Sequence, residues 1–255
     1  MTGQGSTARR TRRYFFRVEY DGGRYAGWQS QKNAPTIQDH LQRAFSTVTR
    51  SSCPVTGAGR TDAGVHARAQ GAHVDAPCEL DPAGTVYAVN AVLPPDIAVF
   101  DLKEVSPSFH ARYSALRRRY VYRIVLKKAP LSRNRAWCVT LPVNWNRVRR
   151  NAAALAGRHD FTTFCSANTS TDNMVCTVYE ASLHRHREMY FLTIEADRFV
   201  YKMVRSIVGT LVDIGRGRIQ RNIEELIEAR CRGEAGETAP PRGLTLESVT
   251  YPEIA

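Results

Sequence analysis

One loop in this sequence combines residue types that could do chemistry. Residues 57–70 hold a single carboxylate, Asp62, between the guanidinium groups of Arg60 and Arg68. The glycines of this stretch are Gly57, Gly59 and Gly64. Because glycine allows close approaches that a side chain would block, a large ligand could reach Asp62, and a carboxylate there can attack a substrate covalently. We interpret Asp62 as the reactive group; the alternative is a turn in which it pairs with Arg60 or Arg68 at the surface.

The positive charge of the chain is concentrated in one stretch. Lys and Arg outnumber Asp and Glu by 36 − 24 = 12, and residues 112–150 alone contain twelve Lys or Arg and no acidic residue. The aromatic residues among these cations are Tyr113, Tyr120, Tyr122, Trp137 and Trp145. A stretch of one sign with flat side chains indicates a polyanionic partner that also presents bases. We predict nucleic acid, with Arg117 and Arg118 among its contacts; the alternative is a basic surface without a partner.

Length and composition limit the class of protein. A chain of 255 residues that is 43% hydrophobic is long enough for one large domain or two modest ones. We expect no membrane span, because no segment is long and apolar enough. The cysteines include no C-x-x-C pair, so neither a zinc site nor a disulfide framework is expected, and reduced thiols fit a cytoplasmic protein. Residues 1–13 are interpreted as a disordered basic arm, with a transit peptide as the alternative.

The first half of the chain is predicted to contain six elements in the order β-α-β-β-α-β. Phe16, Val18 and Tyr20 alternate with polar residues, as in a strand with one buried face. Thr36 and Asp81 are typical N-caps for the two helices. The expected strands are 14–20, 54–58, 67–74 and 97–105, and the expected helices begin at Ile37 and Pro82.

The second half repeats this order with one added helix. The expected strands are 120–126, 177–183, 189–196 and 244–251, and the expected helices follow Asn144, run from Val200 to Gly215 and follow Asn222. Two such units are the ferredoxin-like, split βαβ motif used twice. We therefore predict an α+β protein whose two βαββαβ halves, residues 14–105 and 106–255, join through a central mixed sheet across one cleft.

The helix predicted from Val200 to Gly215 also places one cation. Its apolar residues recur at intervals of three and four positions, so they form one buried stripe. Arg205 lies off the centre of that stripe and could reach the cleft beside Asp62. The alternative is a solvated arginine on an outer face.

Seven blocks of the sequence together resemble one enzyme family. They are Tyr25–Gln31 (YAGWQSQ), Gly59–Ala67 (GRTDAGVHA), Val89–Pro94 (VNAVLP), Phe109–Ala115 (FHARYSA), Arg119–Arg123 (RYVYR), Met203–Gly209 (MVRSIVG) and Ala239–Leu244 (APPRGL). With these blocks the chain resembles the TruA-type tRNA pseudouridine synthases from Tyr14 onward. The resemblance implies the pseudouridine synthase fold and a homodimeric, cytoplasmic enzyme without cofactor or metal. It also implies the reaction, the isomerisation of uridines 38, 39 and 40 in the anticodon stem-loop of tRNA.

The matching blocks also imply roles for four residues of this chain. Asp62 matches the nucleophile of the family, and Arg205 matches the basic partner of that aspartate. Tyr120 matches the tyrosine that contacts the base, and Arg60 matches the arginine beside the catalytic loop. These four residues form the expected catalytic and substrate-binding set.

The implied reaction suits a carboxylate. Pseudouridine forms when the bond from uracil N1 to ribose C1′ breaks, the uracil rotates, and C5 bonds to C1′. Because C1′ becomes oxocarbenium-like as the base leaves, Asp62 could stabilise or attack it; an adduct at the uracil ring and a glycal route stay open. Water must be excluded, or the base would be lost. Flipping the uridine costs roughly a few kcal/mol, and stacking on Tyr120, at about 1–3 kcal/mol, would offset much of it.

Two other functions fit parts of the sequence. A non-catalytic RNA-binding protein of two RRM-like units would explain the basic stretch but not the loop around Asp62. A nucleoside glycosidase or transferase would use the same aspartate and release uracil. Nucleoside analysis after incubation with unmodified tRNA separates the three, because each predicts a different product: pseudouridine, no change, or free uracil.

Overall fold

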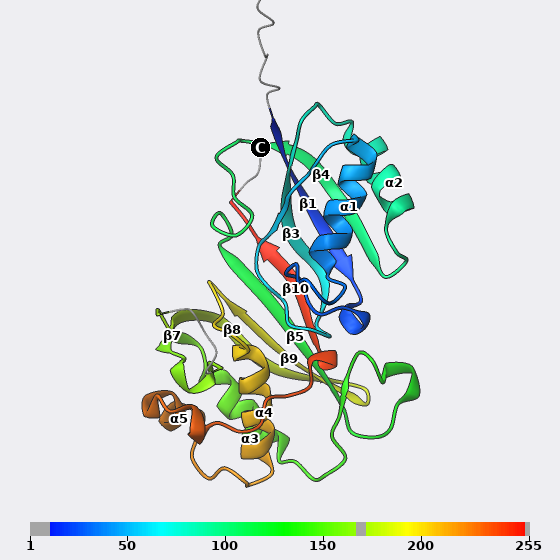
Figure 1. Cartoon of the computed structure of the whole chain (residues 1–255). Coiled ribbons are helices and arrows are strands. Elements are labelled where there is room, and N and C mark those ends of the chain that lie inside the picture. The colour runs from blue at the N-terminus through cyan, green and yellow to red at the C-terminus, as the bar shows by residue number, and fades with distance from the viewer. Residues whose placement is uncertain (1–10, 167–171, 253–255) are drawn as a thin grey trace, which may run out of the picture.

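One ten-stranded sheet forms the centre of the computed structural model, which describes residues 11–166 and 172–252 (Figure 1). Its strands lie in the order β4 (Ile97–Val105), β1 (Arg12–Tyr20), β3 (His66–Ala76), β10 (Leu244–Thr250), β5 (Arg117–Val125), β9 (Met189–Ala196), β8 (Val175–His186) and β7 (Gly157–Asp160). Two short strands pair beside this path, β2 (Val55–Gly57) with β3 and β6 (Trp137–Cys138) with β5.

Four helices begin where the sequence predicts them. They are α1 (Ile37–Thr49), α2 (Pro82–Val92), α3 (Trp145–Ala153) and α5 (Ile223–Ala229). Their N-caps are Thr36, Asp81, Asn144 and Asn222. Each cap side chain accepts a hydrogen bond from a backbone N–H in the first turn, which satisfies a donor that the helix itself leaves free.

Several predicted boundaries shift: among the strands, β5 begins at Arg117 instead of Tyr120, and β8 runs from Val175 to His186 instead of over 177–183. The helix expected from Val200 is α4 (Met203–Gly215), because Lys202 has a left-handed backbone with φ of 61° and the helix begins after it. Val200 is nevertheless buried, which explains why it fits the apolar stripe. β1 begins at Arg12, so the last two residues of the predicted arm 1–13 belong to the sheet. The first ten residues of that arm lie outside the described residues.

The two halves join where β10 lies between β3 and β5. β10 is parallel to β3 and antiparallel to β5. Along the chain the first half reads β1-α1-β2-β3-α2-β4, and the second reads β5-α3-β8-β9-α4-β10 with β6, β7 and α5 added. The predicted α+β class, two βαββαβ halves joined through a mixed sheet, is therefore confirmed.

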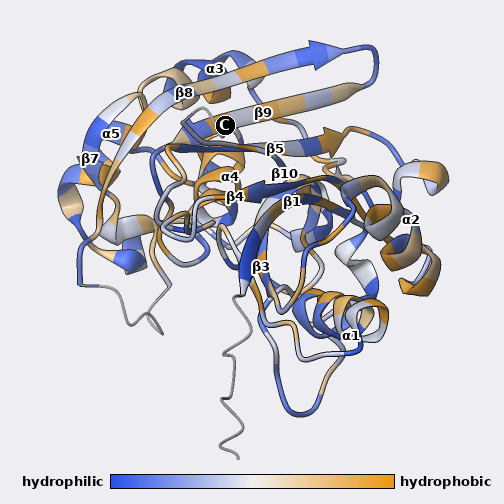
Figure 2. Cartoon of the chain, turned by 90° about the horizontal axis from the view of Figure 1, so that it is seen from above, coloured by the Kyte–Doolittle hydropathy of each residue, from blue (hydrophilic) through white to orange (hydrophobic). Residues whose placement is uncertain are grey.

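Each half packs a hydrophobic core between the sheet and its own helices. Apolar segments of α2 and α4 are visible in Figure 2. Leu246 of β10 belongs to the first core and Leu244 to the second, and side chains two positions apart on a strand point to one face. Tyr120 packs against both cores. Because β10 serves both halves, we keep the division into residues 14–105 and 106–255 as a proposal.

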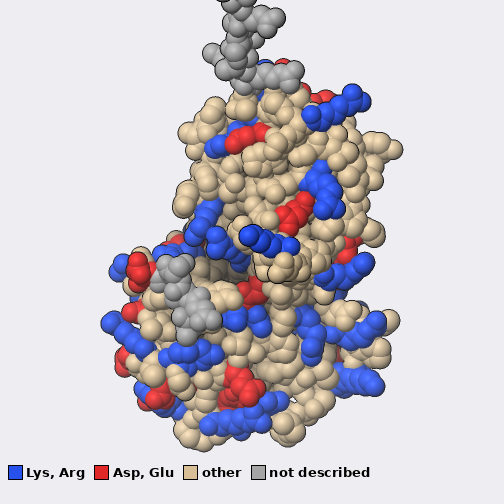
Figure 3. All heavy atoms as spheres, in the orientation of Figure 1, with Lys and Arg blue, Asp and Glu red and all other residues tan. Residues whose placement is uncertain are grey.

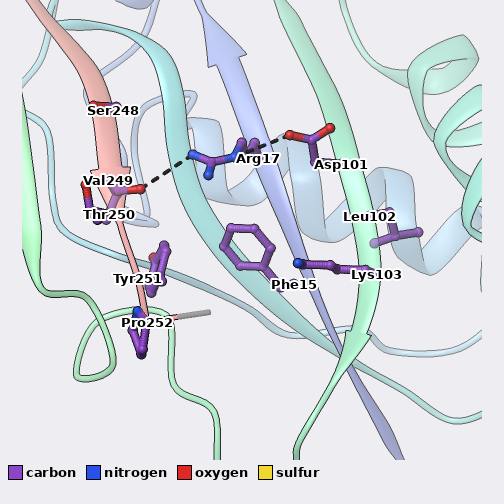
Figure 4. Close-up of a pocket in the computed structure, with 10 residues that line it drawn as sticks. All are labelled: Phe15, Arg17, Asp101, Leu102, Lys103, Ser248, Val249, Thr250, Tyr251 and Pro252. Carbon is purple, nitrogen blue, oxygen red and sulfur yellow. Dashed lines mark hydrogen bonds and ion pairs between the residues drawn. The ribbon is translucent and has the colours of Figure 1, made fainter. Parts of the chain in front are cut away.

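The face of the sheet that the helices do not cover carries a shallow pocket of about 540 Å³ (Figure 4). Phe15 and Arg17 of β1 line it, together with Asp101 of β4, whose Oδ2 is 3.3 Å from Arg17 Nε. Phe15 alternates along β1 with Tyr14 and Phe16, which both belong to the core of the first half. None of the four predicted site residues lines this pocket, so it is separate from the site.

His73 of β3 makes the stability of the fold depend on pH. It is buried, and its Nδ1 accepts a hydrogen bond from the backbone N–H of Ala111 at 3.1 Å. Burial lowers the pKa of His73 to about 4, helped by the charges of Arg13 and His110 and opposed by Asp75. The folded chain therefore keeps His73 neutral at pH values where the unfolded chain binds a proton.

We expect the free energy of unfolding to fall as the pH drops from 6.5 toward 4. Above pH 6.5 the ring is neutral in both states, whereas below it the unfolded state takes up the proton first and gains stability. His73 should contribute about 2 kcal/mol to the loss between pH 7.5 and pH 5, measured by urea unfolding. His73→Asn keeps an acceptor for Ala111 without a titrating ring, so its loss should be smaller; an equal loss contradicts the assignment.

Candidate active site

The Asp62 loop, residues 58–65, connects β2 to β3 and lies directly on the segment 22–28. The backbone N–H of Trp28 donates a hydrogen bond to the carbonyl oxygen of Thr61 at 3.1 Å. Gly27 has a φ of 96°, and a Cβ built there would lie 2.5 Å from the same carbonyl oxygen. Only glycine therefore fits at this contact.

Buried side chains fix the loop just before Asp62. The hydroxyl groups of Tyr20 and Thr61 share a hydrogen bond of 2.8 Å. Burial raises the pKa of Tyr20 far above its ordinary value, so this hydroxyl stays neutral. Gln70 of β3 is fully buried, and its Nε2 donates to the carbonyl oxygen of Gly59 at 2.9 Å. These contacts hold the backbone on which the carboxylate is mounted.

Asp62 forms an ion pair with Arg205 from the other half of the chain. Nη1 of Arg205, in the first turn of α4, lies 2.6 Å from Oδ2 of Asp62. Nε of the same guanidinium donates to the carbonyl oxygen of Ala239 at 2.9 Å, so the arginine is held at two points. The side chains of Arg205 and Asp62 are only 14% and 18% exposed. Oδ1 of Asp62 has no hydrogen-bond partner among the described residues, and it is available to a ligand.

The surface pairing considered for Asp62 is not what the structure shows. Arg68 pairs with Glu247 instead, at 2.9 Å. Arg60 is exposed, and within the described ranges it makes no hydrogen bond or ion pair. The structure therefore brings Asp62 and Arg205 together, and within the described ranges it leaves Arg60, two residues before Asp62 in the same loop, without a partner.

Tyr120 of β5 lies close enough to Asp62 to sense its charge. The ring packs edge-to-face on Phe199, with centroids 5.1 Å apart. Burial and the negative charge of Asp62 raise the pKa of Tyr120 above its usual range, against the opposite effect of Arg118. In the part of the chain that the structure describes, the hydroxyl has no hydrogen-bond partner. It is therefore a neutral donor that a ligand can meet.

The arginines of β5 divide between the two faces of the sheet. Arg118 shares the helix-covered face with Tyr120, whereas its neighbours on the strand alternate to the opposite face. Those neighbours meet acids there: Arg117 pairs with Glu195 at 3.2 Å, Arg119 with Glu180 at 2.8 Å and Arg123 with Glu247 at 3.6 Å. The charges of Arg117, Arg119 and Arg123 are thus compensated by acids on that face, so we expect Arg117 to contribute little to binding a nucleic acid, whereas Arg118 has no acid partner among the described residues.

The site also rests on residues that the sequence reasoning missed. They are Tyr20, Gln70, Arg118 and Tyr122. The hydroxyl of Tyr122 donates to the carbonyl oxygen of Pro240 at 2.7 Å and so fixes the segment that also holds Arg205. Of these, only the place of Arg118 could have been inferred from the sequence. It lies two positions before Tyr120, so the two side chains share one face of a strand that begins at Arg117.

The surroundings of the loop are basic. Figure 3 shows Lys and Arg side chains around the hollow between the two halves. Within residues 11–166 and 172–252, no three His, Cys, Asp or Glu side chains are grouped so as to hold a metal ion, and no described helix could cross a membrane. A half-buried carboxylate with one free oxygen, a neutral tyrosine hydroxyl and cations around them suit covalent catalysis on a polyanion.

Comparison with known proteins gives a consistent family. The sequence pattern of the family described as tRNA pseudouridine synthase matches residues 17–114 and 152–252. The chain is 42% identical over 237 residues to the tRNA pseudouridine synthase A of Thermoanaerobacter sp. (strain X514), which covers 92% of this chain and 97% of the relative. It is 40% identical over 243 residues to that of Exiguobacterium sibiricum, with 95% and 98% covered. It is 41% identical over 244 residues to that of Maricaulis maris, with 94% and 98% covered.

Proposed function

The chain belongs to the tRNA pseudouridine synthase family, a family of isomerases, and we propose that it converts uridines 38, 39 and 40 of the anticodon stem-loop with Asp62 as the nucleophile. The observation that carries this proposal is the Asp62–Arg205 ion pair, which leaves one carboxylate oxygen free. The three positions, a twofold dimer and a cytoplasmic location are supported by the resemblance of the sequence blocks, and they are part of the same proposal.

The proposed reaction balances without a second substrate. Oδ1 of Asp62 attacks C1′ as the bond to N1 breaks, and the bonding electron pair leaves on the uracil. The uracil rotates, C5 bonds to C1′, and the carboxylate leaves. C5 then loses its proton and N1 gains one, so that product and substrate have the same composition. An adduct at the uracil ring or a glycal route would start from the same carboxylate.

The surrounding residues have distinct proposed roles. Arg205 holds Oδ2 of Asp62, so that Oδ1 faces the substrate. The ring of Tyr120 stacks on the flipped base, and its hydroxyl takes part in moving the proton of C5. Arg60, exposed and without a partner in the described ranges, meets a phosphate beside the uridine.

Tyr120→Phe separates the hydroxyl from the ring. We expect tRNA binding to change by less than about threefold, because the stacking surface is kept. The single-turnover rate should fall about a hundredfold, since general acid–base groups contribute about 10²–10⁴. Tyr179→Phe removes an exposed hydroxyl on the opposite sheet face and should leave the rate unchanged. A Tyr120→Phe rate equal to wild type would leave only the stacking role.

Nucleoside analysis of modified transcripts tests the proposed function. Three tRNA transcripts would carry uridine at position 38, 39 or 40 only, and a fourth would carry none at these positions. We expect pseudouridine in the first three and none in the fourth. Free uracil would indicate a glycosidase, and a bound but unchanged transcript would indicate an RNA-binding protein.

A further inference from the structure

The guanidinium of Arg118 is bound by backbone carbonyl groups. It donates to the carbonyl oxygens of Ala58 at 3.2 Å, Arg112 at 2.7 Å, Ala115 at 2.9 Å and Asp197 at 2.7 Å. Although it is half-buried, Arg118 forms no ion pair with any carboxylate of the described chain. Arg117 and Arg119, on either side of it, each pair with an acid. Arg118 is therefore held by the geometry of backbone groups and not by a counter-charge.

The four carbonyl groups belong to three segments that meet at the site. Ala58 begins the loop that carries Asp62, four residues before the carboxylate. Asp197 lies in the connection from β9 to α4, the helix that carries Arg205. The other two carbonyl groups belong to the segment 106–116, which joins the two halves. One guanidinium thus contacts the backbone on both sides of the ion pair at the centre of the site.

Only arginine can make this set of contacts. Its guanidinium is planar and offers five N–H donors in a fixed fork. Lysine carries the same charge on a single nitrogen, which cannot span carbonyl groups from three segments. Asp197, whose backbone carbonyl accepts a hydrogen bond from Arg118, is itself held in place. Its side-chain carboxylate accepts hydrogen bonds from the backbone N–H groups of Thr177 at 2.9 Å and Arg198 at 2.7 Å.

We propose that Arg118 is a positioning residue for Asp62. It sets the separation between the Asp62 loop and the start of α4, so that the carboxylate and Arg205 meet in the orientation that the reaction needs. A misplacement of about an ångström can slow catalysis about a hundredfold, so a contact this close to the loop has a large effect. The kinetic consequence rests on the proposed function, whereas the effect on the loop does not.

Two substitutions at Arg118 separate charge from geometry. Arg118→Lys keeps the charge and loses most of the contacts, and Arg118→Met loses both. Arg117→Lys and Arg117→Met are the matched controls one residue away, where the guanidinium pairs with Glu195 and lies 4.2 Å from the ring centroid of Tyr179. Each variant is measured in three ways: amide hydrogen exchange of the free protein, the Kd for tRNA, and the single-turnover rate of pseudouridine formation.

We expect both Arg118 variants to exchange faster in peptides covering residues 55–64, where the N–H of Ala58 bonds to the carbonyl oxygen of Gly71 at 2.8 Å. The single-turnover rate should fall at least about tenfold in Arg118→Lys and about a hundredfold in Arg118→Met, with Kd within about threefold. The Arg117 variants should match wild type in every measurement.

Three results would overturn the proposal: unchanged exchange of the Asp62 loop, a wild-type rate in Arg118→Lys, or faster exchange throughout the protein, which would show a general loss of stability. If the wild-type protein forms no pseudouridine, the proposed function fails. The exchange experiment then still decides whether Arg118 positions the loop.

Discussion

Asp62→Asn is expected to fold, to bind tRNA and to form no pseudouridine. The substitution keeps the size of the side chain and the loop contacts at Thr61 and Gly59, but it removes the charge and the nucleophilic oxygen. Arg205 then loses the carboxylate that it meets at 2.6 Å. We expect the single-turnover rate to fall by at least about a thousandfold, with saturating enzyme used to separate chemistry from binding.

Asp62→Glu tests the position of the carboxylate instead of its presence. One added methylene moves the group by about an ångström, and a shift of that size can cost about a hundredfold in rate. The control is Asp101→Asn, which removes a carboxylate paired with Arg17 on the opposite face of the sheet and should leave the rate unchanged. A rate in Asp62→Asn above about one per cent of wild type would assign the chemistry to another residue.

Arg205→Met should also slow the reaction strongly. It leaves the half-buried carboxylate of Asp62 without the hydrogen bond that orients it, and it frees the carbonyl oxygen of Ala239. Breaking a partly buried pair by removing one partner leaves the other charge uncompensated, and we expect the single-turnover rate to fall by about two orders of magnitude. Measured Kd values should change much less, because Arg205 already uses two of its nitrogens inside the protein.

Arg68→Met is the matched control for Arg205→Met. It removes an arginine from the stretch 57–70, which also holds Asp62, and that arginine also pairs with a carboxylate, Glu247 at 2.9 Å, but its side chain is 65% exposed. Exposed pairs contribute about 0–1 kcal/mol to stability, so we expect little change in stability and none in rate. Equal loss in the two variants would mean that charge near the site, and not the orientation of Asp62, limits the reaction.

The elements of the fold are predictable from the sequence because their signals are local. A cap such as Thr36 contacts a residue three positions away, and strand alternation needs only neighbouring residues. The start of α4 was not predictable, since the left-handed backbone of Lys202 leaves no trace in the apolar pattern and Val200 is buried in the same core. The place of β10 between β3 and β5 depends on pairing between distant segments and has no local signal.

The two central residues of the site, Asp62 and Arg205, were predictable for a similar reason, but the residues that hold them in position were not. The glycine-rich loop marks Asp62, and the phase of one helix directs Arg205 toward it. The position of Arg118 on the strand indicates the face it shares with Tyr120, but its contacts were not predictable, because its partners are carbonyl groups from 3 to 79 residues away and every residue type has a carbonyl. The charges of residues 112–150 likewise give no indication that acids of other strands, such as Glu195 of β9, pair with the arginines of β5.

A single turnover with tRNA labelled with tritium at uracil C5 tests the role of Asp62 most directly. Because C5 exchanges its hydrogen for the bond to C1′, each pseudouridine formed must release one tritium to water. For the wild-type protein we predict tritium release in step with pseudouridine formation and no free uracil, and for Asp62→Asn we predict no release. Free uracil from the wild type, or tritium release by Asp62→Asn, would contradict the assignment of Asp62 as the nucleophile of a tRNA pseudouridine synthase.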